Sequence, residues 1–475
     1  MDLRKKKIHM VGIGGIGMSG LSFLLAEMGC KVSGSDIEEN NIIKRLRRKG
    51  VLVNIGHDTS HVKDQDLVVY SSSIQKSNPE LLAAKSRKTP VISRTELLKM
   101  LMDKNKKIVA VTGTHGKTTI TAMASLMLEE AGFDPTVLIG GESPHFGGNA
   151  KLGKSETLVA EVDESDGRFV ITRPTHIIVP NLEKEHVEHY RDERHLVDTF
   201  RRFLNAQSAR SIFFYGIENR NLRKIAASYK GKTVSFGFSE EADIYAANVE
   251  REAFKIGFDC FCKDKKVGRF TINIPGVHNV LNALAVISLG IDLKVDTGTI
   301  KHVLASYKGV KRRFEVIGEL NGAKIVEDYA HHPTEIRATI SAARSLKTIR
   351  RLIVVFQPHR YTRTKSFYKE FSGSFAGANE VILTKVYPAT EDSINGATSS
   401  SIYDIMAKKN NPLPVKLLEK AAIPRYLSVK AKNGDLILIL GAGDIGKIAQ
   451  EARFPKIKGK VLFNEPLFKH TTFRV

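Results

Sequence analysis

The sequence predicts an α/β protein in which three strand–helix series follow one another along the chain. Its 475 residues suit two or three domains at about 150 residues each. Apolar strand segments alternate with helical segments, which is typical of parallel sheets with helices on their faces. Glycine-rich loops follow the first strand of the first two series, within Val11–Gly20 and Lys107–Met123. These loops also point to phosphate ligands.

The first series fills about the first hundred residues. Its expected strands and helices are Ile8–Val11, Ser19–Met28, Lys31–Ser35, Ile42–Lys49 and Asp66–Tyr70. Both helices are followed by glycine, a usual signal for a helix end. The charged stretch from Asp103 to Lys107 then forms a joint to the second series.

The second series begins with the strand Ile108–Val111 and the helix Thr118–Ala131, and it continues with strands at Thr157–Val162, Ile177–Val179 and Ile212–Tyr215. The third begins after the basic run Lys308–Arg313 and includes the strands Leu352–Phe356, Glu380–Thr384 and Leu436–Leu440. The last stretch contains Pro455 and Pro466 and is expected to be an irregular tail.

Composition narrows the class of protein. The net charge is +22, yet the basic clusters are scattered and the chain has no Trp, so we expect small phosphorylated ligands rather than nucleic acid. The three cysteines cannot make a disulfide framework or a four-cysteine zinc site, which favours the cytoplasm. No apolar run reaches the ~18 residues of a membrane span. The oligomeric state stays open.

The first glycine-rich loop carries G-x-G-x-x-G as Gly12, Gly14 and Gly17. Asp36 ends the next strand, where a dinucleotide site binds a ribose hydroxyl. Such a turn also arises from close helix–strand packing alone. The loop therefore leaves open a dinucleotide, another phosphate or no ligand.

The second loop is the sharper signal, because a strand precedes it and a helix follows it. Backbone N–H groups in such a turn converge on one point, Lys117 can reach terminal phosphates, and the Thr118 hydroxyl is placed to bind Mg²⁺. The spacing departs from the usual phosphate-loop motif, since position 111 is Val. A tight turn is the alternative to nucleotide binding. The expected nucleotide-binding residues are Gly113, Thr114, His115, Gly116, Lys117, Thr118 and Thr119.

Two acidic runs follow later strands, and either can be a site or a solvated surface. The first holds Glu161, Asp163, Glu164 and Asp166, and the second holds Glu183, Glu185 and His186. Ligand sites of α/β sheets collect at strand ends. Mg²⁺ prefers oxygen ligands, so a histidine ligand would also suit Mn²⁺.

Three further groups combine polar residues. Asn279 and Asn282 share a helix face and suit either an adenine edge or helix capping. Asp328 and Tyr329 precede the pair His331 and His332, at a strand end. Arg360 and Arg363 are spaced to form a fork for a carboxylate or phosphate.

Ten motifs in order resemble the Mur ligases of bacterial cell-wall synthesis over residues 8–450. They are IHMVGIGGIGMSG, VSGSD, GTHGKTT, EVDESDG, NLEKEH, PGVHNVLNALA, KGVKRRF, EDYAHHPTE, FQPHRYTRT and GAGDIG. The resemblance implies a Rossmann-like UDP-sugar-binding domain over residues 1–103, a P-loop ATPase-like central domain over 104–307, and a Rossmann-like amino-acid-binding domain with the tail over 308–475.

The resemblance also implies an activity, that of the alanine-adding member of the family. ATP would phosphorylate the lactyl carboxylate of UDP-N-acetylmuramic acid, and L-alanine would attack the acyl phosphate in peptidoglycan precursor synthesis. Mg²⁺ or Mn²⁺ would assist. Three alternative hypotheses remain: a peptide-recycling ligase of the same family, a dehydrogenase and a non-catalytic polyanion-binding module. The motif FQPHRYTRT favours the alanine-adding enzyme over the recycling ligase.

The residues implied by the resemblance fall into four groups. The UDP-sugar site would use Gly12, Gly14, Gly15, Gly17, Asp36, His57, Ser71 and Ser72. The ATP site would add Asn279, Asn282, Arg313 and Asp328 to the second loop, with Thr118, Glu161 and His186 as metal ligands. Tyr329, His331, Arg360 and Arg363 would hold the amino acid and acyl phosphate, and Lys117 would act in catalysis with the last three.

The chain departs from the family in two places. Glu185 and Glu188 stand where the family often has Asp. No Lys occurs between His186 and Asn205, so the carbamylated lysine of the later-acting ligases is not expected.

Overall fold

The computed structural model describes residues 3–448 apart from 253, 347, 390 and 409–412. The predicted tail around Pro455 and Pro466 lies outside the described residues. The chain divides into two compact units. The first holds residues 1–183, 193–244 and 285–303, and the second holds 184–192, 245–284 and 304–475.

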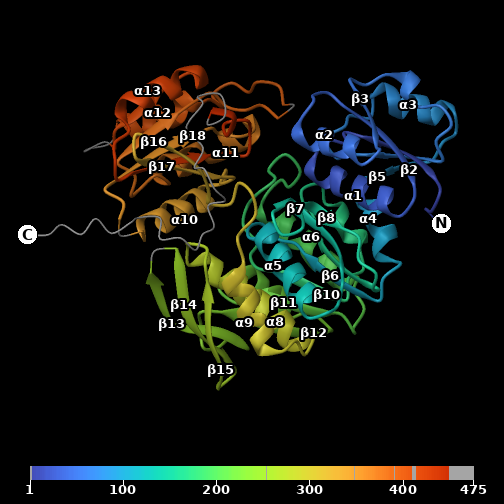
Figure 1. Ribbon diagram of the computed structural model, residues 1–475, viewed down its shortest axis with the longest axis horizontal. Helices are drawn as coiled ribbons and strands as arrows, with labels where there is room; N and C mark the ends of the chain where they lie inside the picture. The colour runs from blue at the N-terminus through green and yellow to red at the C-terminus, as the bar shows by residue number, and fades with distance from the viewer. Residues whose placement is uncertain (1–2, 253, 347, 390, 409–412, 449–475) are drawn as a thin grey trace, which may run out of the picture. The chain divides into compact units, whose positions relative to one another are not determined.

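The first unit opens with a parallel sheet of strand order β3-β2-β1-β4-β5. Figure 1 draws this part of the chain in blue. Its strands are β1 (Lys7–Val11), β2 (Lys31–Asp36), β3 (Leu52–Ile55), β4 (Leu67–Tyr70) and β5 (Val91–Ser93). Its helices are α1 (Ile16–Glu27), α2 (Asn41–Arg48), η1 (Thr59–His61), α3 (Pro79–Ser86) and α4 (Arg94–Met102). The alternation of strands and helices thus gives the parallel sheet that it predicts.

Seven strands of the central sheet belong to the same unit, in the order β12-β11-β10-β6-β9-β7-β8. The strands are β6 (Lys107–Val111), β7 (Thr136–Ser143), β8 (Gly148–Lys151), β9 (Thr157–Glu161), β10 (His176–Val179), β11 (Ile212–Gly216) and β12 (Lys232–Gly237). All pair in parallel except β7 with β8. The helices are α5 (Lys117–Glu130), η2 (Arg168–Ile171), α6 (Glu193–Asn205) and α7 (Arg220–Ala226). The buried helix α5 follows β6, as the second loop predicts.

Buried polar contacts join the two sheets of the first unit. The Asn149 side chain on β8 is 3% exposed and donates to the Ile16 carbonyl oxygen at 2.5 Å and to Ser19 Oγ at 3.2 Å, both on α1. From α2, Arg45 donates to Glu142 Oε1 at 3.0 Å and to Asn149 Oδ1 at 3.2 Å. Because a buried amide needs its partners, these bonds tie α1 to the β7–β8 hairpin.

Three strands were not predicted from the sequence: β13 (Ile244–Glu252), β14 (Lys255–Cys262) and β15 (Lys265–Ile272). All their residues except Ile244 belong to the second unit. β14 and β15 are antiparallel, with a register shift between Cys260 and Phe261. Helices α8 (His278–Asp292) and α9 (Thr297–Ser306) follow in the chain.

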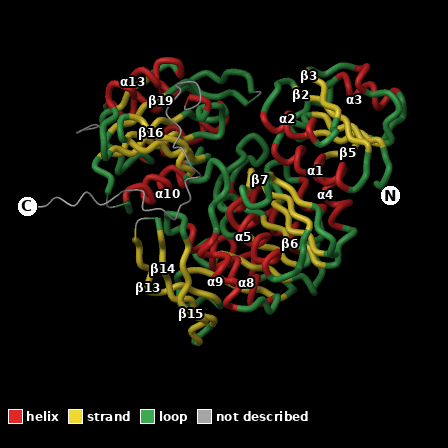
Figure 2. Tube along the Cα trace, in the orientation of Figure 1, coloured by secondary structure: helices red, strands yellow, loops and turns green. Residues whose placement is uncertain are grey.

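The C-terminal sheet of the second unit has the order β16-β17-β21-β18-β19-β20. Figure 2 shows its strands in yellow, with the red helices α10 and α13 on either side. Its strands are β16 (Glu315–Leu320), β17 (Ala323–Asp328), β18 (Arg351–Phe356), β19 (Glu380–Leu383), β20 (Val415–Leu417) and β21 (Asp435–Leu440), and only β16 is antiparallel. Its helices are α10 (Pro333–Arg344), α11 (Tyr361–Gly373), α12 (Ser399–Ala407), η3 (Lys420–Ala422) and α13 (Ile423–Lys430).

Alternate residues of the central strand β18 enter two different cores. Leu352, Val354 and Phe356 pack in the cluster that includes residues of α10 and α11. Ile353 and Val355 pack in the cluster that includes residues of α13. A strand buried on both faces reads as a continuous apolar run, which is why this one is evident from sequence. Within the described part of the chain, no helix is both long and apolar enough to cross a bilayer.

Candidate functional site

The first glycine-rich loop is held by the end of β2. Gly12, at a φ of +81°, donates its N–H to the Ser35 carbonyl oxygen at 2.9 Å, and the Gly14 N–H donates to Asp36 Oδ2 at 2.8 Å. Gly15 is the N-cap of α1. The loop therefore presents a helix N-terminus at the carboxyl edge of the sheet, a favourable place for an anion.

The other predicted UDP-sugar residues lie around this edge. His57 follows β3, and its Nδ1 lies 3.0 Å from Ser35 Oγ. Ser71 follows β4 and donates its N–H to the Val11 carbonyl oxygen at 3.1 Å, while Ser72 is exposed. At Gly17 an added Cβ would clash with the guanidinium of Arg94, a residue that sequence reasoning missed.

The second loop needs glycine at two positions. Gly113 and Gly116 have φ values of +106° and +86°, a region that favours glycine. A Cβ on Gly113 would lie 2.7 Å from the Asn181 carbonyl oxygen. The segment after β10 thus packs directly on the loop, and Gly116 opens α5 as its N-cap.

Lys117 is folded over this loop. Its Nζ donates to the carbonyl oxygens of Gly113 at 2.5 Å and Thr114 at 3.0 Å, and to Glu164 Oε1 at 2.9 Å. Burial works against its charge, but Glu164 and Glu161 outweigh burial and raise the pKa of Lys117. The loop therefore holds a permanent cation at its centre.

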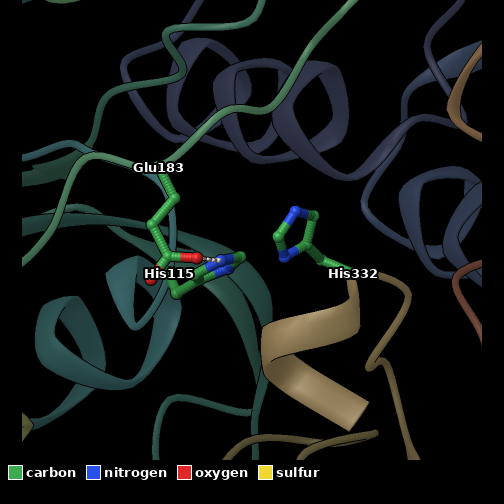
Figure 3. Close-up of side chains that lie close together, drawn as sticks. All are labelled: His115, Glu183 and His332. Carbon is green, nitrogen blue, oxygen red and sulfur yellow. Dashed lines mark ion pairs between the residues drawn. The ribbon is translucent and has the colours of Figure 1, made fainter. Parts of the chain in front are cut away.

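The segment after β10 braces the loop through backbone and side-chain contacts. The His115 N–H donates to Asn181 Oδ1 at 2.8 Å, and the Glu183 N–H donates to Thr114 Oγ1 at 2.9 Å. Figure 3 shows the Glu183 carboxylate facing the His115 ring, with Oε2 3.6 Å from Nε2. The figure also shows His332, which caps the N-terminus of α10.

Two of the predicted metal ligands belong to the first unit: the Thr118 hydroxyl on α5 and the Glu161 carboxylate at the end of β9. Thr118 is 4% exposed, and Thr119 is 9% exposed. Glu161 ends β9 and accepts the Gly140 N–H at 2.8 Å. A hydroxyl and a carboxylate are ligands that suit Mg²⁺, so this donor set fits the ion that the resemblance implies.

In the second unit, Arg363 forms a buried ion pair. Its Nε donates to Glu185 Oε1 at 2.9 Å and its Nη2 lies 2.7 Å from the same oxygen, with side chains 4% and 6% exposed. Burial disfavours the charged form of Glu185, but the positive charge of Arg363 outweighs burial and holds the pKa of Glu185 well below its ordinary value. The next residue, His186, has a positive φ of 51° and places Nδ1 3.6 Å from Glu188 Oε1.

Arg360 faces other carboxylates than Arg363 does. It is the N-cap of α11 at a φ of +70° and donates to Glu391 Oε1 at 3.1 Å, with Glu188 Oε1 at 3.8 Å. Glu391 also accepts from the N–H and hydroxyl of Thr362. The two arginines expected to form one fork are thus each paired with a protein carboxylate.

The two asparagines of α8 bond to each other rather than capping the helix by side chain. Asn282 Nδ2 donates to Asn279 Oδ1 at 3.0 Å, and Asn279 Nδ2 donates to the Pro275 carbonyl oxygen at 2.7 Å. Both residues are buried. This pair leaves Asn282 Oδ1 as an acceptor of the kind that an adenine amino group needs.

The end of β17 carries Asp328 and Tyr329. Asp328 accepts the N–H groups of Phe314 at 2.7 Å and Ala330 at 2.8 Å, and burial raises its pKa to about 6. The Tyr329 ring lies 4.9 Å from the guanidinium carbon of Arg312 and 5.2 Å from that of Arg313. Sequence reasoning missed Arg312, which also pairs with Glu327 at 2.6 Å.

His331 lies beside this tyrosine and is buried enough to be neutral. Its Nδ1 lies 2.9 Å from the Tyr329 carbonyl oxygen and 3.2 Å from Glu335 Oε2, both acceptors, so Nδ1 carries the proton. Burial lowers the pKa of His331 to about 4. At neutral pH its Nε2 therefore offers a lone pair.

Family models cover most of the chain. The Mur ligase family, catalytic domain, matches residues 7–106; the Mur ligase middle domain matches 111–290; and the Mur ligase, glutamate ligase domain, matches 312–443. Among curated relatives, the UDP-N-acetylmuramate–L-alanine ligase of Trichlorobacter lovleyi is 42% identical over 446 residues, which is 93% of this chain and 96% of the relative. That of Geobacter sulfurreducens is also 42% identical, over 93% of this chain and 95% of its own.

Solved structures of other proteins have a fold similar to that of this chain. The UDP-N-acetylmuramate-alanine ligase of Thermotoga maritima has a TM-score of 0.81 and 28% identity, covering 94% of this chain and 98% of its own. A murein peptide ligase from Psychrobacter arcticus, at 23% identity, a TM-score of 0.71, and 94% and 98% coverage, has the same fold. The three matched models and the curated relatives of similar length together show that the chain belongs to the Mur ligase family.

Proposed function

We propose that this chain joins L-alanine to the lactyl carboxylate of UDP-N-acetylmuramic acid at the expense of ATP, in the cytoplasm, as a step of peptidoglycan precursor synthesis. The observation that carries this proposal is the 42% identity with UDP-N-acetylmuramate–L-alanine ligases along 93% of the chain. The two glycine-rich loops support it, because a sugar nucleotide and a triphosphate each need such a loop. A dehydrogenase would leave the second loop without a ligand.

In the proposed reaction, the γ-phosphoryl group of ATP passes to the lactyl carboxylate, and the amine of L-alanine then displaces phosphate from the acyl phosphate. Lys117 neutralises charge on the transferred group. Thr118, Glu161 and His186 are the residues proposed to hold Mg²⁺, which when bound would supply further positive charge at the phosphates. Asn279, Asn282, Arg313 and Asp328 are proposed to contact ATP.

Tyr329, His331, Arg360 and Arg363 are the residues proposed to hold the amino acid and the acyl phosphate. A base with a pKa of about 4 accepts a proton from an ammonium group poorly. We therefore assign His331 to positioning of the amine through its Nε2 rather than to its deprotonation.

ADP release measured with each co-reactant omitted in turn tests the activity. We expect full turnover only with ATP, UDP-N-acetylmuramic acid and L-alanine together. If L-alanyl-γ-D-glutamyl-diaminopimelate replaces alanine as the better acceptor in direct competition, the recycling activity is correct instead. No ADP release with any combination would overturn both.

Replacing His331 with Ala tests its role. We expect the KM for alanine to rise by about tenfold or more, the worth of one lost hydrogen bond to a charged group, while the KM for ATP stays within about twofold. Because His331 is neutral well above pH 4, the effect should be the same at pH 7 and pH 9. Unchanged amide formation across an alanine titration would rule the role out.

A further inference from the structure

A buried carboxylate with several histidine neighbours lies beneath the first glycine-rich loop. Glu80 of α3 has no exposed side-chain surface. Its Oε2 accepts the Ser35 hydroxyl at 2.5 Å and lies 3.1 Å from His57 Nδ1. Its Oε1 lies 2.6 Å from His61 Nδ1 and 3.6 Å from Nε2 of His9. These five residues, here the Glu80 cluster, come from β1, β2, η1, α3 and the loop after β3.

The Glu80 carboxylate is charged. Burial by itself raises the pKa of Glu80, but the imidazoles of His9 and His61 and the Ser35 hydroxyl outweigh it and lower the pKa to about 2. Asp58, at the N-cap of η1, also carries a charge that acts on Glu80 and on His61. A fully desolvated carboxylate is costly unless such partners compensate. An apolar residue at this position of α3 would avoid the cost of desolvating a carboxylate. The buried charge therefore points to a role other than stability.

Hydrogen bonds connect the Glu80 cluster to the glycine-rich loop. Ser35 accepts the N–H groups of Gly12 at 2.9 Å and Ile13 at 3.0 Å on its carbonyl oxygen, while its hydroxyl reaches Glu80. The Gly56 N–H donates to the Asp36 carbonyl oxygen at 2.8 Å, which sets His57 at the same strand end. The ligands of open α/β sheets bind at this edge.

The contacts of His57 fix where its proton lies. The ionised Glu80 accepts only, and Ser35 spends its own hydrogen on Glu80, so His57 Nδ1 must donate to this pair. A second proton can then enter only at Nε2. The His57 side chain is 14% exposed, whereas that of Glu80 has no exposed surface.

We propose that Glu80 is a positioning residue for the sugar nucleotide: it orients His57 and stabilises its imidazolium form, so that Nε2–H donates to the diphosphate bound at Gly12–Gly17. Binding of the sugar nucleotide then takes up a proton from solvent onto His57. A carboxylate behind a histidine acts in this way in other sites, by fixing the ring and stabilising its charge. The proposal rests on the proposed function, since it takes UDP-N-acetylmuramic acid as the ligand.

Replacing Glu80 with Gln in the full chain keeps the shape and removes the charge. We expect the KM for UDP-N-acetylmuramic acid to rise about tenfold, the worth of one charge-assisted hydrogen bond, with kcat and the KM values for ATP and alanine within about twofold. Calorimetric titration of the sugar nucleotide at pH 8, in two buffers of different ionisation enthalpy, should show proton uptake for the unmodified protein and none for E80Q.

Two variants separate positioning from a structural role. H61Q removes an even closer partner than His57 from the other oxygen of Glu80, and we expect it to lower the unfolding temperature but to leave the KM for the sugar nucleotide within about twofold. In an H57Q background, E80Q should have no further effect on that KM. Three outcomes would each overturn the proposal. H61Q and E80Q could raise the KM for the sugar nucleotide equally, E80Q and H57Q could have additive effects on that KM, or the unmodified protein could take up no proton on binding. If the unmodified protein does not turn over this sugar nucleotide at all, the proposed function itself fails.

Discussion

Lys117→Ala is expected to lower kcat for ADP release by about 10³-fold, the upper range for loss of one charge-stabilising donor. The physical reason is that this ammonium group is the cation over the loop, held by two carbonyl oxygens and Glu164. The substitution also removes the ammonium group that pairs with Glu164, whose side chain is only 2% exposed. The phosphates of ATP would then face the negative charge of this carboxylate. Steady-state kinetics with saturating alanine and sugar nucleotide measure the loss.

Lys151→Ala is the matched control for this variant. Lys151 also pairs with two carboxylates of the first unit, Glu129 and Asp134, each at 2.6 Å, but it lies on β8 away from the loop. We expect its kcat to stay within about twofold, because these ion pairs are partly open to solvent and pairs near the surface contribute only about 1 kcal/mol or less. Comparable losses in both variants would mean that Lys117 has no special role in phosphoryl transfer.

Arg363→Ala is expected to abolish ligase activity and to destabilise the C-terminal sheet by about 3–5 kcal/mol. The substitution leaves Glu185 buried and charged without its guanidinium, and the cost of an unpaired buried charge is large. Differential scanning calorimetry should show the transition of the second unit at a lower temperature. The first unit provides an internal reference in the same scan.

The double variant R363M/E185Q separates stability from chemistry. Replacing both partners removes the buried charges, so we expect at least half of the lost stability to return while activity stays absent. Lys385→Ala, which breaks the exposed pair with Glu419, should cost about 1 kcal/mol or less. An active, fully stable R363A protein would show that the ion pair is neither structural nor catalytic.

The parts of the fold that local patterns encode were predictable. The apolar runs of β6, β18 and β21 are buried on both faces and stand out in the sequence. The strands β13 to β15 were missed, because their exposed positions carry charged residues and β14 shifts register at Cys260. Antiparallel strands with one solvated face carry a weaker apolar signal than buried parallel ones.

The candidate site divides in the same way. The glycines of both loops and Lys117 are evident because the chemistry of a phosphate loop lies within a few consecutive residues. The pairing of Arg363 with Glu185 joins residues 178 positions apart, and no local pattern announces it. Glu391 and Glu80 likewise have no signal in sequence, since their roles come from partners that only the folded chain brings close.

The bonds of Asn149 and Arg45 bear on substrate choice. These bonds tie α1 and α2 to the β7–β8 hairpin, so we expect the two glycine-rich loops of the first unit, which are proposed to bind the diphosphate and the triphosphate, to keep a constant separation. A sugar nucleotide anchored by its diphosphate can then bring to the γ-phosphate only an acid group carried on an arm of one length. We therefore expect hexose nucleotides that lack the lactyl ether, or that carry a longer acidic substituent, to be poor substrates because their acid group would not reach the γ-phosphate.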